Sequence, residues 1–339
     1  NVRGIVLEAI SFLGCGSWGG ALGNVLSKKG IPVLFWHRNP TIVREHKDSR
    51  QHYLIKDLKF SDNVTFTYDL EFAIRSSSII VIAIPSQVIR KLISENRYIL
   101  NEEKLIVNVS KGIEVDSLMT MSEVIDDVYG EKYARTVVLS GPSHAEEVVR
   151  NFPTTLVASS TNKNAAKSIQ TLFSNEYLRT YLNPDVKGVE IGGALKNVMA
   201  IAAGICDGIN YGDNSKAALM TRGMSEIIRL GKQMGAKGKT FRGLSGFGDL
   251  IVTCLSKHSR NRRVGQAIGE GKSLDTIQRT MKMIAEGVLT TKAVHQLRLK
   301  YDLEMPIHEA MYDILFMNKD PKESVSELMN RKLGNEHRK

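Results

Sequence analysis

The segment AISFLGCGSWGGALGNVLSKKG, residues 9 to 30, decides how the first half of the chain folds. It begins with a short apolar run, and three glycines follow at the spacing Gly14, Gly16, Gly19. The residues after them have the composition of a helix that ends at Gly30, since glycine commonly caps helix C-termini. A strand, a glycine-rich turn and a helix in this order are typical of a turn that holds a dinucleotide.

Each glycine of this turn has its own role in a dinucleotide site. Gly14 makes the turn, Gly16 lets the backbone approach the pyrophosphate, and Gly19 lets the helix pack closely on the strand. Backbone N–H groups at the start of the helix then bind the phosphates. Glycines at this spacing also serve other tight turns, so the prediction depends on the strand and helix around them.

The next apolar run, PVLFWHRNP at residues 32–40, indicates which dinucleotide fits. A site specific for NAD normally has an acidic residue about 20 positions after the glycines. Between Ala9 and Arg44 there is no Asp or Glu, and the run ends in His37 and Arg38. A guanidinium attracts a 2′-phosphate, so this pattern favours NADPH while leaving NADH open. An exposed arginine at the end of a strand would give the same pattern.

The two halves of the chain differ in pattern. The first half alternates short apolar runs with helical patterns, and the runs lack period-2 alternation, which suits strands buried on both faces of a parallel sheet. From about residue 185 only helical spacing remains. We therefore expect an α/β protein with an N-terminal Rossmann-like, doubly wound sheet in residues 1–188 and an all-helical domain in residues 189–339. The predicted strands lie within residues 9–14, 32–37, 78–85, 104–112, 136–142 and 154–160.

Composition indicates a globular cytoplasmic protein. The 339 residues are 42% hydrophobic and 24% charged, and the most apolar run, residues 76–85, is shorter than the roughly 18 residues of a membrane span. Three separated cysteines have neither metal-ligand nor disulfide spacing, so we expect no metal.

The net charge of +10 is spread along the chain and aromatic residues make up 6%, which argues against nucleic-acid binding. Either a solvated basic surface or attraction of phosphorylated small molecules explains the charge.

Lys196 is the only charged residue between Ile191 and Cys206. Helical geometry turns it toward Gly192, Ala200 and Ala203, whose small side chains leave room for a ligand. Desolvation lowers the pKa of a lysine, which makes it useful as an acid or base near neutral pH. A structural lysine paired with a carboxylate from another segment explains the pattern equally well.

Two more segments carry candidate site residues. Lys111 follows the run KLIVNV, which places it at the carboxyl edge of the sheet, where ligands of open α/β folds bind. A glycine-rich loop delivers Asp249 to a helix start, and the run SRNRR at residues 259–263 follows it. Arginine beside asparagine and serine is a reasonable phosphate clamp, although basic runs more often form a solvated face.

Five segments together resemble the bacterial NAD(P)-dependent glycerol-3-phosphate dehydrogenase family. They are GCGSWGGAL, SKG, SGPSHAEE, GGALKNVMAIAAGICDGI and GLSGFGDLIVTC with SRNRR, in order between about residues 12 and 317. The resemblance implies reversible reduction of dihydroxyacetone phosphate to sn-glycerol 3-phosphate, the precursor of glycerophospholipids, and it suggests a homodimer. The chain departs from the family's pattern at Gly20 and Ser143, where threonine is common.

The resemblance also implies roles for individual residues. Lys196 matches the family's proton donor and acceptor, with Lys111 and Asp249 completing the catalytic set. The positions implied to bind the cofactor, beside Gly14, Gly16 and Gly19, are Ser17, Trp18, His37, Arg38, Lys111, Ala145, Arg260, Ile284 and Glu286. The positions implied to bind the substrate are Lys111, Gly141, Ser143, Lys196, Asp249, Ser259, Arg260 and Asn261.

Two alternatives remain open from sequence. A related 3-hydroxyacid-type dehydrogenase would also use a glycine loop, a helical second domain and a lysine, although the segment GGALKNVMA argues against it. A non-catalytic NADPH-binding sensor would keep the fold and lose the chemistry. Such a sensor should have lost some of Lys111, Lys196, Asp249 and Arg260, and all four are present.

Overall fold

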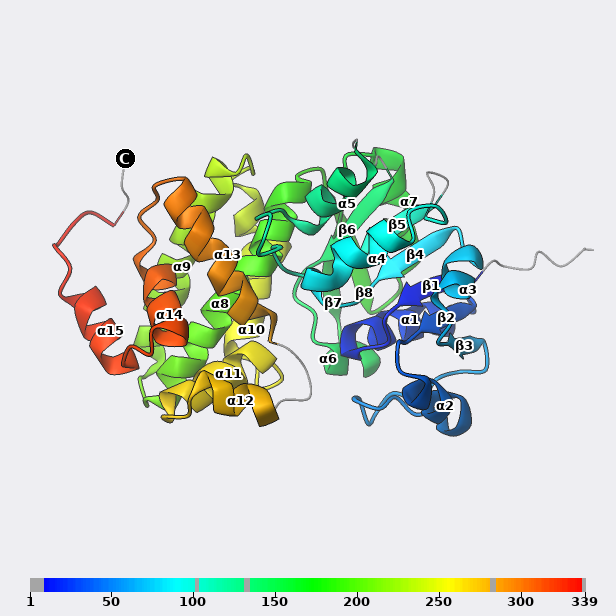
Figure 1. The fold of residues 1–339 in the computed structure, drawn as a ribbon, viewed down its shortest axis with the longest axis horizontal. Helices are drawn as coiled ribbons and strands as arrows, with labels where there is room; N and C mark the ends of the chain where they lie inside the picture. The colour runs from blue at the N-terminus through cyan, green and yellow to red at the C-terminus, as the bar shows by residue number, and fades with distance from the viewer. Residues whose placement is uncertain (1–8, 101–103, 131–134, 281–284, 337–339) are drawn as a thin grey trace, which may run out of the picture.

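The computed structural model describes residues 9–100, 104–130, 135–280 and 285–336. The sheet and its helices form one half of the molecule, and helices α8 to α15 form the other (Figure 1). The strands are β1 (Ile10–Leu13), β2 (Val33–Trp36), β3 (Val64–Thr67), β4 (Ile79–Ile82), β5 (Leu105–Asn108), β6 (Thr136–Ser140), β7 (Thr154–Ser159) and β8 (Leu178–Asn183).

The helices of the first half connect these strands and cover the sheet. They are α1 (Ser17–Lys28), α2 (Pro40–Ser49), α3 (Leu70–Arg75), α4 (Ile89–Glu95), α5 (Met121–Tyr129), α6 (Ala145–Val149) and α7 (Lys163–Phe173). The second half contains α8 (Val186–Gly208), α9 (Asp213–Gln233), α10 (Asp249–Leu255), α11 (Arg260–Gly269), α12 (Leu274–Thr280), α13 (Glu286–Lys300), α14 (Pro306–Phe316) and α15 (Pro321–Met329). A π-helical turn, Leu244–Gly248, precedes α10.

The eight strands form one sheet in the order β3-β2-β1-β4-β5-β6-β7-β8. The strands from β3 to β6 are parallel, and the chain order reverses between β1 and β4. Ligands of doubly wound sheets bind at the carboxyl ends of the strands beside such a reversal. The doubly wound α/β prediction is therefore confirmed, and so are the six predicted strands.

The sheet differs from the prediction at its edges. β3 and β8 are additional strands, and β7 runs antiparallel to β6. The connection between β6 and β7 contains only the five-residue helix α6, which rises about 7.5 Å, whereas a five-residue strand spans about 17 Å. A parallel crossover is usually carried by a longer helix than these five residues, and here the chain returns antiparallel.

The long helix α8 forms the centre of the second half. Asp185 caps the start of α8, because its side chain accepts a hydrogen bond from Gly188 N (3.2 Å). Among the described residues α8 is long and apolar enough to cross a membrane, unlike the run 76–85 noted in the sequence, yet its apolar stretch is wholly buried inside the protein. A helix that is apolar on all sides is typical of a domain core.

Glycines bring α8 and α11 into backbone contact. A Cβ at Gly204 would lie 1.9 Å from Arg262 O, and one at Gly265 would lie 1.8 Å from Ile201 O. No side chain fits at either position, because the two backbones occupy the space. This close approach fixes the start of α11, which carries the basic run, beside the middle of α8.

A buried carboxylate joins α8 to α5 of the first half. Glu190 accepts hydrogen bonds from Ser122 N (2.9 Å) and from Ser122 Oγ (2.5 Å). Desolvation by burial raises the pKa of Glu190 from 4.5 to about 7, although the bonds from Ser122 oppose the shift.

The raised pKa of Glu190 predicts a pH-dependent stability. Between pH 4.5 and 7 the folded state holds a proton that the unfolded state has released, so the free energy of unfolding falls as pH rises through this range. Glu190→Gln removes this loss, and we expect it to raise the free energy of unfolding by about 3 kcal/mol at pH 8 and by nearly nothing at pH 4.5. Urea unfolding at both pH values measures the effect, and an equal gain at both would exclude titration of Glu190 as its cause.

Candidate active site

The glycine turn lies between β1 and α1, at the carboxyl end of the central strand. Gly14 has φ +115°, and a Cβ there would lie 2.4 Å from Ala83 O, so only glycine fits this turn. A Cβ at Gly19 would lie 2.5 Å from Gly14 O. These contacts have the geometry predicted for the turn and for the close packing of helix on strand.

The start of α1 is suited to an anion. Its N-cap is Gly16, which has no side chain to accept from the first N–H groups, and the first turn contains no acidic residue. The unbonded N–H groups and the helix dipole together attract negative charge. Trp18 in this turn has a buried indole Nε1 without a hydrogen-bond partner among the described residues.

His37 and Arg38 follow directly after β2, as predicted. His37 Nδ1 accepts a hydrogen bond from Asn39 N (3.1 Å), and desolvation is the main cause of the lowered pKa of His37. Arg38 is exposed at this edge of the sheet. The guanidinium of Arg38 and the uncapped start of α1, which follows the neighbouring strand β1, together fit the phosphate groups of NADPH.

Asp249 holds two lysines together at the centre of the site. Its side chain is 1% exposed; Oδ2 accepts from Lys111 Nζ at 2.7 Å, and Oδ1 accepts from Lys196 Nζ. The three residues come from the loop after β5, from α8 and from the start of α10. The structure thus brings together the three predicted catalytic residues from both halves of the chain.

Thr253 is a partner of Lys196 that the sequence did not reveal. Lys196 Nζ donates to Thr253 Oγ1 at 2.7 Å, and Thr253 Oγ1 donates to Asp249 O at 2.6 Å. Thr253 lies four residues after Asp249 on α10, so helical spacing places both side chains on one face. That spacing was the signal available in the sequence.

Burial controls the protonation of Lys196. The residue is 7% exposed, and desolvation is the largest cause that lowers the pKa of its ammonium group, to about 7. The Asp249 carboxylate acts in the opposite direction, and the positive charge of Lys111 lowers the pKa further. A lysine balanced in this way exchanges a proton readily near neutral pH.

The predicted substrate residues after β6 lie beside Lys111. Gly141 O accepts from Lys111 Nζ (3.2 Å) and from Ser143 Oγ (2.9 Å). Ala145, predicted to contact the cofactor, is the first residue of α6 and is buried. The loop 141–145 therefore lies next to the lysine pair.

Residues 259–261 lie at the start of α11. Ser259 Oγ accepts from Arg262 N (3.2 Å) and caps this helix. Asn261 donates to Asn197 Oδ1 (3.0 Å) and accepts from Gly287 N (3.0 Å). The sequence did not single out Asn197, although it directly follows Lys196.

Arg260 and Glu286 lie at the boundary between the two halves. Burial lowers the pKa of the Arg260 guanidinium, and the charge of Glu286 opposes this. Glu286 accepts from Ser86 N (3.1 Å) and Ser86 Oγ (2.6 Å), which ties the start of α13 to the loop after β4. Ile284, the other predicted cofactor residue of this segment, lies outside the described residues.

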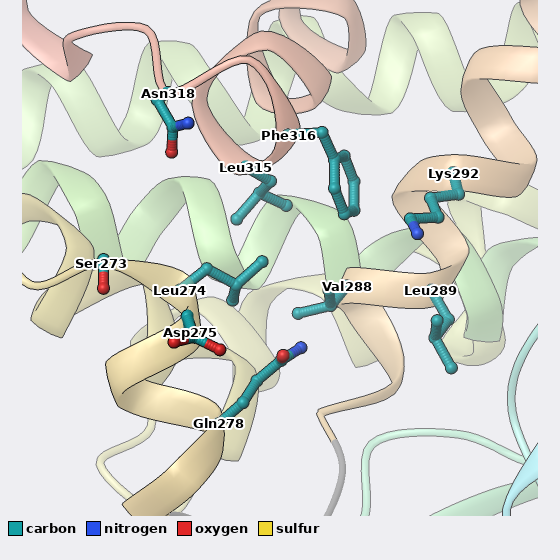
Figure 2. A pocket seen from close by; sticks show the side chains of 10 residues that line it. All are labelled: Ser273, Leu274, Asp275, Gln278, Val288, Leu289, Lys292, Leu315, Phe316 and Asn318. Atoms are coloured by element: carbon teal, nitrogen blue, oxygen red, sulfur yellow. The ribbon is translucent and has the colours of Figure 1, made fainter.

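A separate hollow of about 340 Å³ lies between α12, α13 and α14 (Figure 2). Its walls combine apolar side chains such as Leu274 and Phe316 with Lys292, whose Nζ lies 4.8 Å from the centre of the Phe316 ring. None of the predicted site residues lines it. The lysine–aspartate cluster, not this hollow, contains the groups suited to catalysis.

Two family models match the chain. The NAD-dependent glycerol-3-phosphate dehydrogenase N-terminus matches residues 9–166, and the C-terminus of the same family matches residues 185–326. The chain belongs to the NAD-dependent glycerol-3-phosphate dehydrogenase family. The resemblance expected from the five sequence segments is thereby confirmed.

Individual relatives support this assignment over nearly the whole chain. The glycerol-3-phosphate dehydrogenase [NAD(P)+] of Geobacillus kaustophilus is 49% identical, over 96% of this chain and 95% of its own length. That of Carboxydothermus hydrogenoformans is 46% identical, over 95% of this chain and 96% of its own length. The crystal structure of the Coxiella burnetii glycerol-3-phosphate dehydrogenase, 34% identical, superposes with a TM-score of 0.91 and covers 96% of this chain and 99% of that one.

Proposed function

We propose that the protein is an NAD(P)-dependent glycerol-3-phosphate dehydrogenase that reduces dihydroxyacetone phosphate reversibly to sn-glycerol 3-phosphate, for glycerophospholipid synthesis. The observation that carries the proposal is the Asp249 carboxylate holding Lys111 and Lys196 at the carboxyl end of the sheet. Family membership supports the same reaction. In this proposal the first domain, residues 1–188, holds the cofactor, and residues 189–339 complete the substrate site.

The residues at the glycine turn fit a nicotinamide dinucleotide. Gly14, Gly16, Ser17, Trp18 and Gly19 would hold its pyrophosphate, because α1 begins uncapped at this turn. The other residues that would hold the cofactor are His37, Arg38, Lys111, Ala145, Arg260, Ile284 and Glu286. When bound, the nicotinamide supplies a hydride to the substrate carbonyl or accepts one from the alcohol.

The lysines act on the substrate oxygen. During reduction the carbonyl oxygen gains negative charge, and cations beside it stabilise the transition state more than the ground state. Lys196 Nζ gives its proton to that oxygen and takes it back during oxidation, which a pKa of about 7 allows in both directions. Asp249 and Thr253 hold this ammonium group in place.

The phosphate of the substrate is the proposed anchor. Arg260 supplies a cation, and Ser259 and Asn261 stand beside it at the start of α11. Gly141 and Ser143, which lie next to Lys111, are the other proposed contacts of the substrate. Holding the phosphate fixes the distance between the carbonyl and the nicotinamide. A cytoplasmic homodimer is part of the proposal, and light scattering on the purified protein measures its mass in solution.

Oxidation of NADPH, followed by absorbance, tests the proposed reaction. Addition of dihydroxyacetone phosphate should start rapid oxidation, whereas unphosphorylated dihydroxyacetone should have a kcat/KM about 10³-fold lower, since the phosphate-binding groups remain unpaired. NADH measured in parallel tests the role of Arg38. Turnover of 3-hydroxyacids in place of the phosphorylated ketone would support the related dehydrogenase, and nucleotide binding without turnover would support the sensor.

A further inference from the structure

The loop after β4 lies against the loop after β5, which carries Lys111. Gln87, in the short turn Ser86–Val88 of the first loop, binds the second loop through its side-chain amide. Its Nε2 donates to Ile113 O (2.8 Å), and its Oε1 accepts from Val115 N (3.0 Å). One side chain thus pairs with both kinds of backbone group in the segment that begins two residues after Lys111. No role proposed above uses this contact.

Gln87 supplies a hydrogen bond that the backbone of this segment needs. Ile113 is fully buried, so its carbonyl requires a donor from the protein in place of water. The backbone pairing of the loop with the segment before α5 is made by Glu114 N, which donates to Met119 O (2.9 Å). Removal of the Gln87 amide therefore takes away a donor from a buried carbonyl, and the loop has to shift to replace it.

The loop after β4 also contacts the backbone directly before and after Lys111. Ser110 Oγ donates to Ile84 O (2.6 Å). A Cβ at Gly112 would lie 2.6 Å from the Cβ of Ser86, so the two loops touch at this glycine. Because these contacts lie on both sides of Lys111, they fix the backbone position from which its side chain extends.

The same loop connects Lys111 to the second half of the chain. Ser86 Oγ accepts from Gln87 Nε2 (3.1 Å) and donates to Glu286 Oε2 (2.6 Å). These three side chains form a line of hydrogen bonds from the loop after β5 to the start of α13. Lys111 itself reaches Asp249 of α10, with 2.7 Å between Nζ and Oδ2. The amide of Gln87 therefore lies where the two halves meet beside the lysine pair.

We propose that Gln87 is a positioning residue for Lys111: its amide fixes the loop after β5, so that the ammonium group of Lys111 reaches Asp249 and the substrate oxygen. A lysine side chain is long and flexible, so the position of its charge depends on a fixed backbone. Misplacement of a catalytic group by about 1 Å can cost about 10²-fold in rate. The inference rests on the proposed function, because it assumes that Lys111 acts on the substrate oxygen.

A double-mutant cycle tests whether Gln87 acts through Lys111. Gln87→Met keeps the length of the side chain and removes both hydrogen bonds to the loop, and we expect it to lower kcat for reduction about tenfold. The Kd for NADPH should change less than about threefold, because the glycine turn and Glu286 are unaltered. In the Lys111→Met background the same substitution should lower kcat less than about twofold, since no ammonium group is left to position. Steady-state kinetics at saturating NADPH and dihydroxyacetone phosphate give kcat.

Ser110→Ala tests the same role from the other side of Lys111. Loss of the bond to Ile84 O should lower kcat about threefold in the natural chain and have almost no effect in Lys111→Met. Gln170→Met is the matched control, because Gln170 is also half-buried and its Nε2 donates to Thr180 O (2.9 Å) at the far edge of the sheet. It should lower Tm and leave kcat unchanged.

The outcomes distinguish this inference from the proposed function. If the natural chain does not oxidise NADPH with dihydroxyacetone phosphate, the proposed function fails and the role of Gln87 fails with it. If the natural chain does so, the role of Gln87 alone is overturned by a natural kcat in Gln87→Met, or by an equal loss of kcat with and without Lys111. Should Gln87→Met not fold, Ser110→Ala decides, and the same loss in both backgrounds overturns the inference.

Discussion

Lys196→Ala should lower kcat for reduction of dihydroxyacetone phosphate by about 10³-fold or more, since it removes both a general acid and a cation beside the developing oxyanion. The Kd for NADPH should change little, because the glycine turn belongs to other elements. Asp249 keeps Lys111 as a partner at 2.7 Å, so no carboxylate is left buried without a cation. Steady-state kinetics and nucleotide titration measure the two effects.

Two further variants test whether the loss of kcat in Lys196→Ala comes from the missing ammonium group. Lys196→Met fills more of the buried volume and should show the same loss of kcat, which excludes a cavity as the cause. Lys187→Ala changes the charge of the same helix at its partly exposed first turn, where Lys187 pairs with Glu123, and should leave kcat near that of the natural chain. Turnover of Lys196→Ala at the natural rate would show that another group moves the proton.

Asp249→Asn should lower activity and stability together. The substitution leaves two ammonium groups without the anion between them, and breaking a buried ion pair of this kind costs about 3–5 kcal/mol. The Asp249 carboxylate raises the pKa of Lys196, so its loss lowers that pKa further below about 7. At pH 7 we expect Lys196 to be mostly neutral and the kcat for reduction to fall about 10²-fold.

The pH dependence separates this effect from simple destabilisation. In Asp249→Asn the midpoint of the reduction rate should move to lower pH by at least about one unit, a change of about 1.4 kcal/mol in the protonation of Lys196. Asp207→Asn is the matched control, because Asp207 also bridges two cations, Lys216 and Arg262. It should lose stability and keep the midpoint. An unchanged midpoint in Asp249→Asn would refute the proposed control of Lys196 by this carboxylate.

The sequence predicted the central strands and missed the edge strands for one physical reason. Strands buried on both faces have continuous apolar runs, which are visible in the sequence. β3 and β8 lie at the two edges of the sheet and alternate buried with exposed residues, as in Leu178, Arg179 and Thr180. The direction of β7 is set by its short connection and by its neighbours, which a single strand's sequence does not record.

Part of the candidate site could also be predicted from the sequence, and part could not. Lys196 stood out because a charge in an apolar helix needs an explanation, and the sequence left open whether a carboxylate partner or catalysis supplied it. The structure shows a carboxylate partner, Asp249, which Lys196 shares with Lys111, and the catalytic role of Lys196 is part of the proposed function. Other contacts of the site join segments that are far apart in the sequence, so the sequence alone did not predict them. They are the hydrogen bonds of Lys196 with Thr253, of Asn261 with Asn197 and of Ser86 with Glu286.

The pH dependence of the reaction in both directions tests the proposed role of Lys196 most directly. Reduction needs a protonated Lys196 and oxidation needs a neutral one, so kcat for reduction should fall above about pH 7 and kcat for oxidation should fall below it. The two profiles should cross near the same midpoint, as expected for a single group. Rates independent of pH between about 6 and 9 in both directions would contradict proton transfer by a lysine with this pKa.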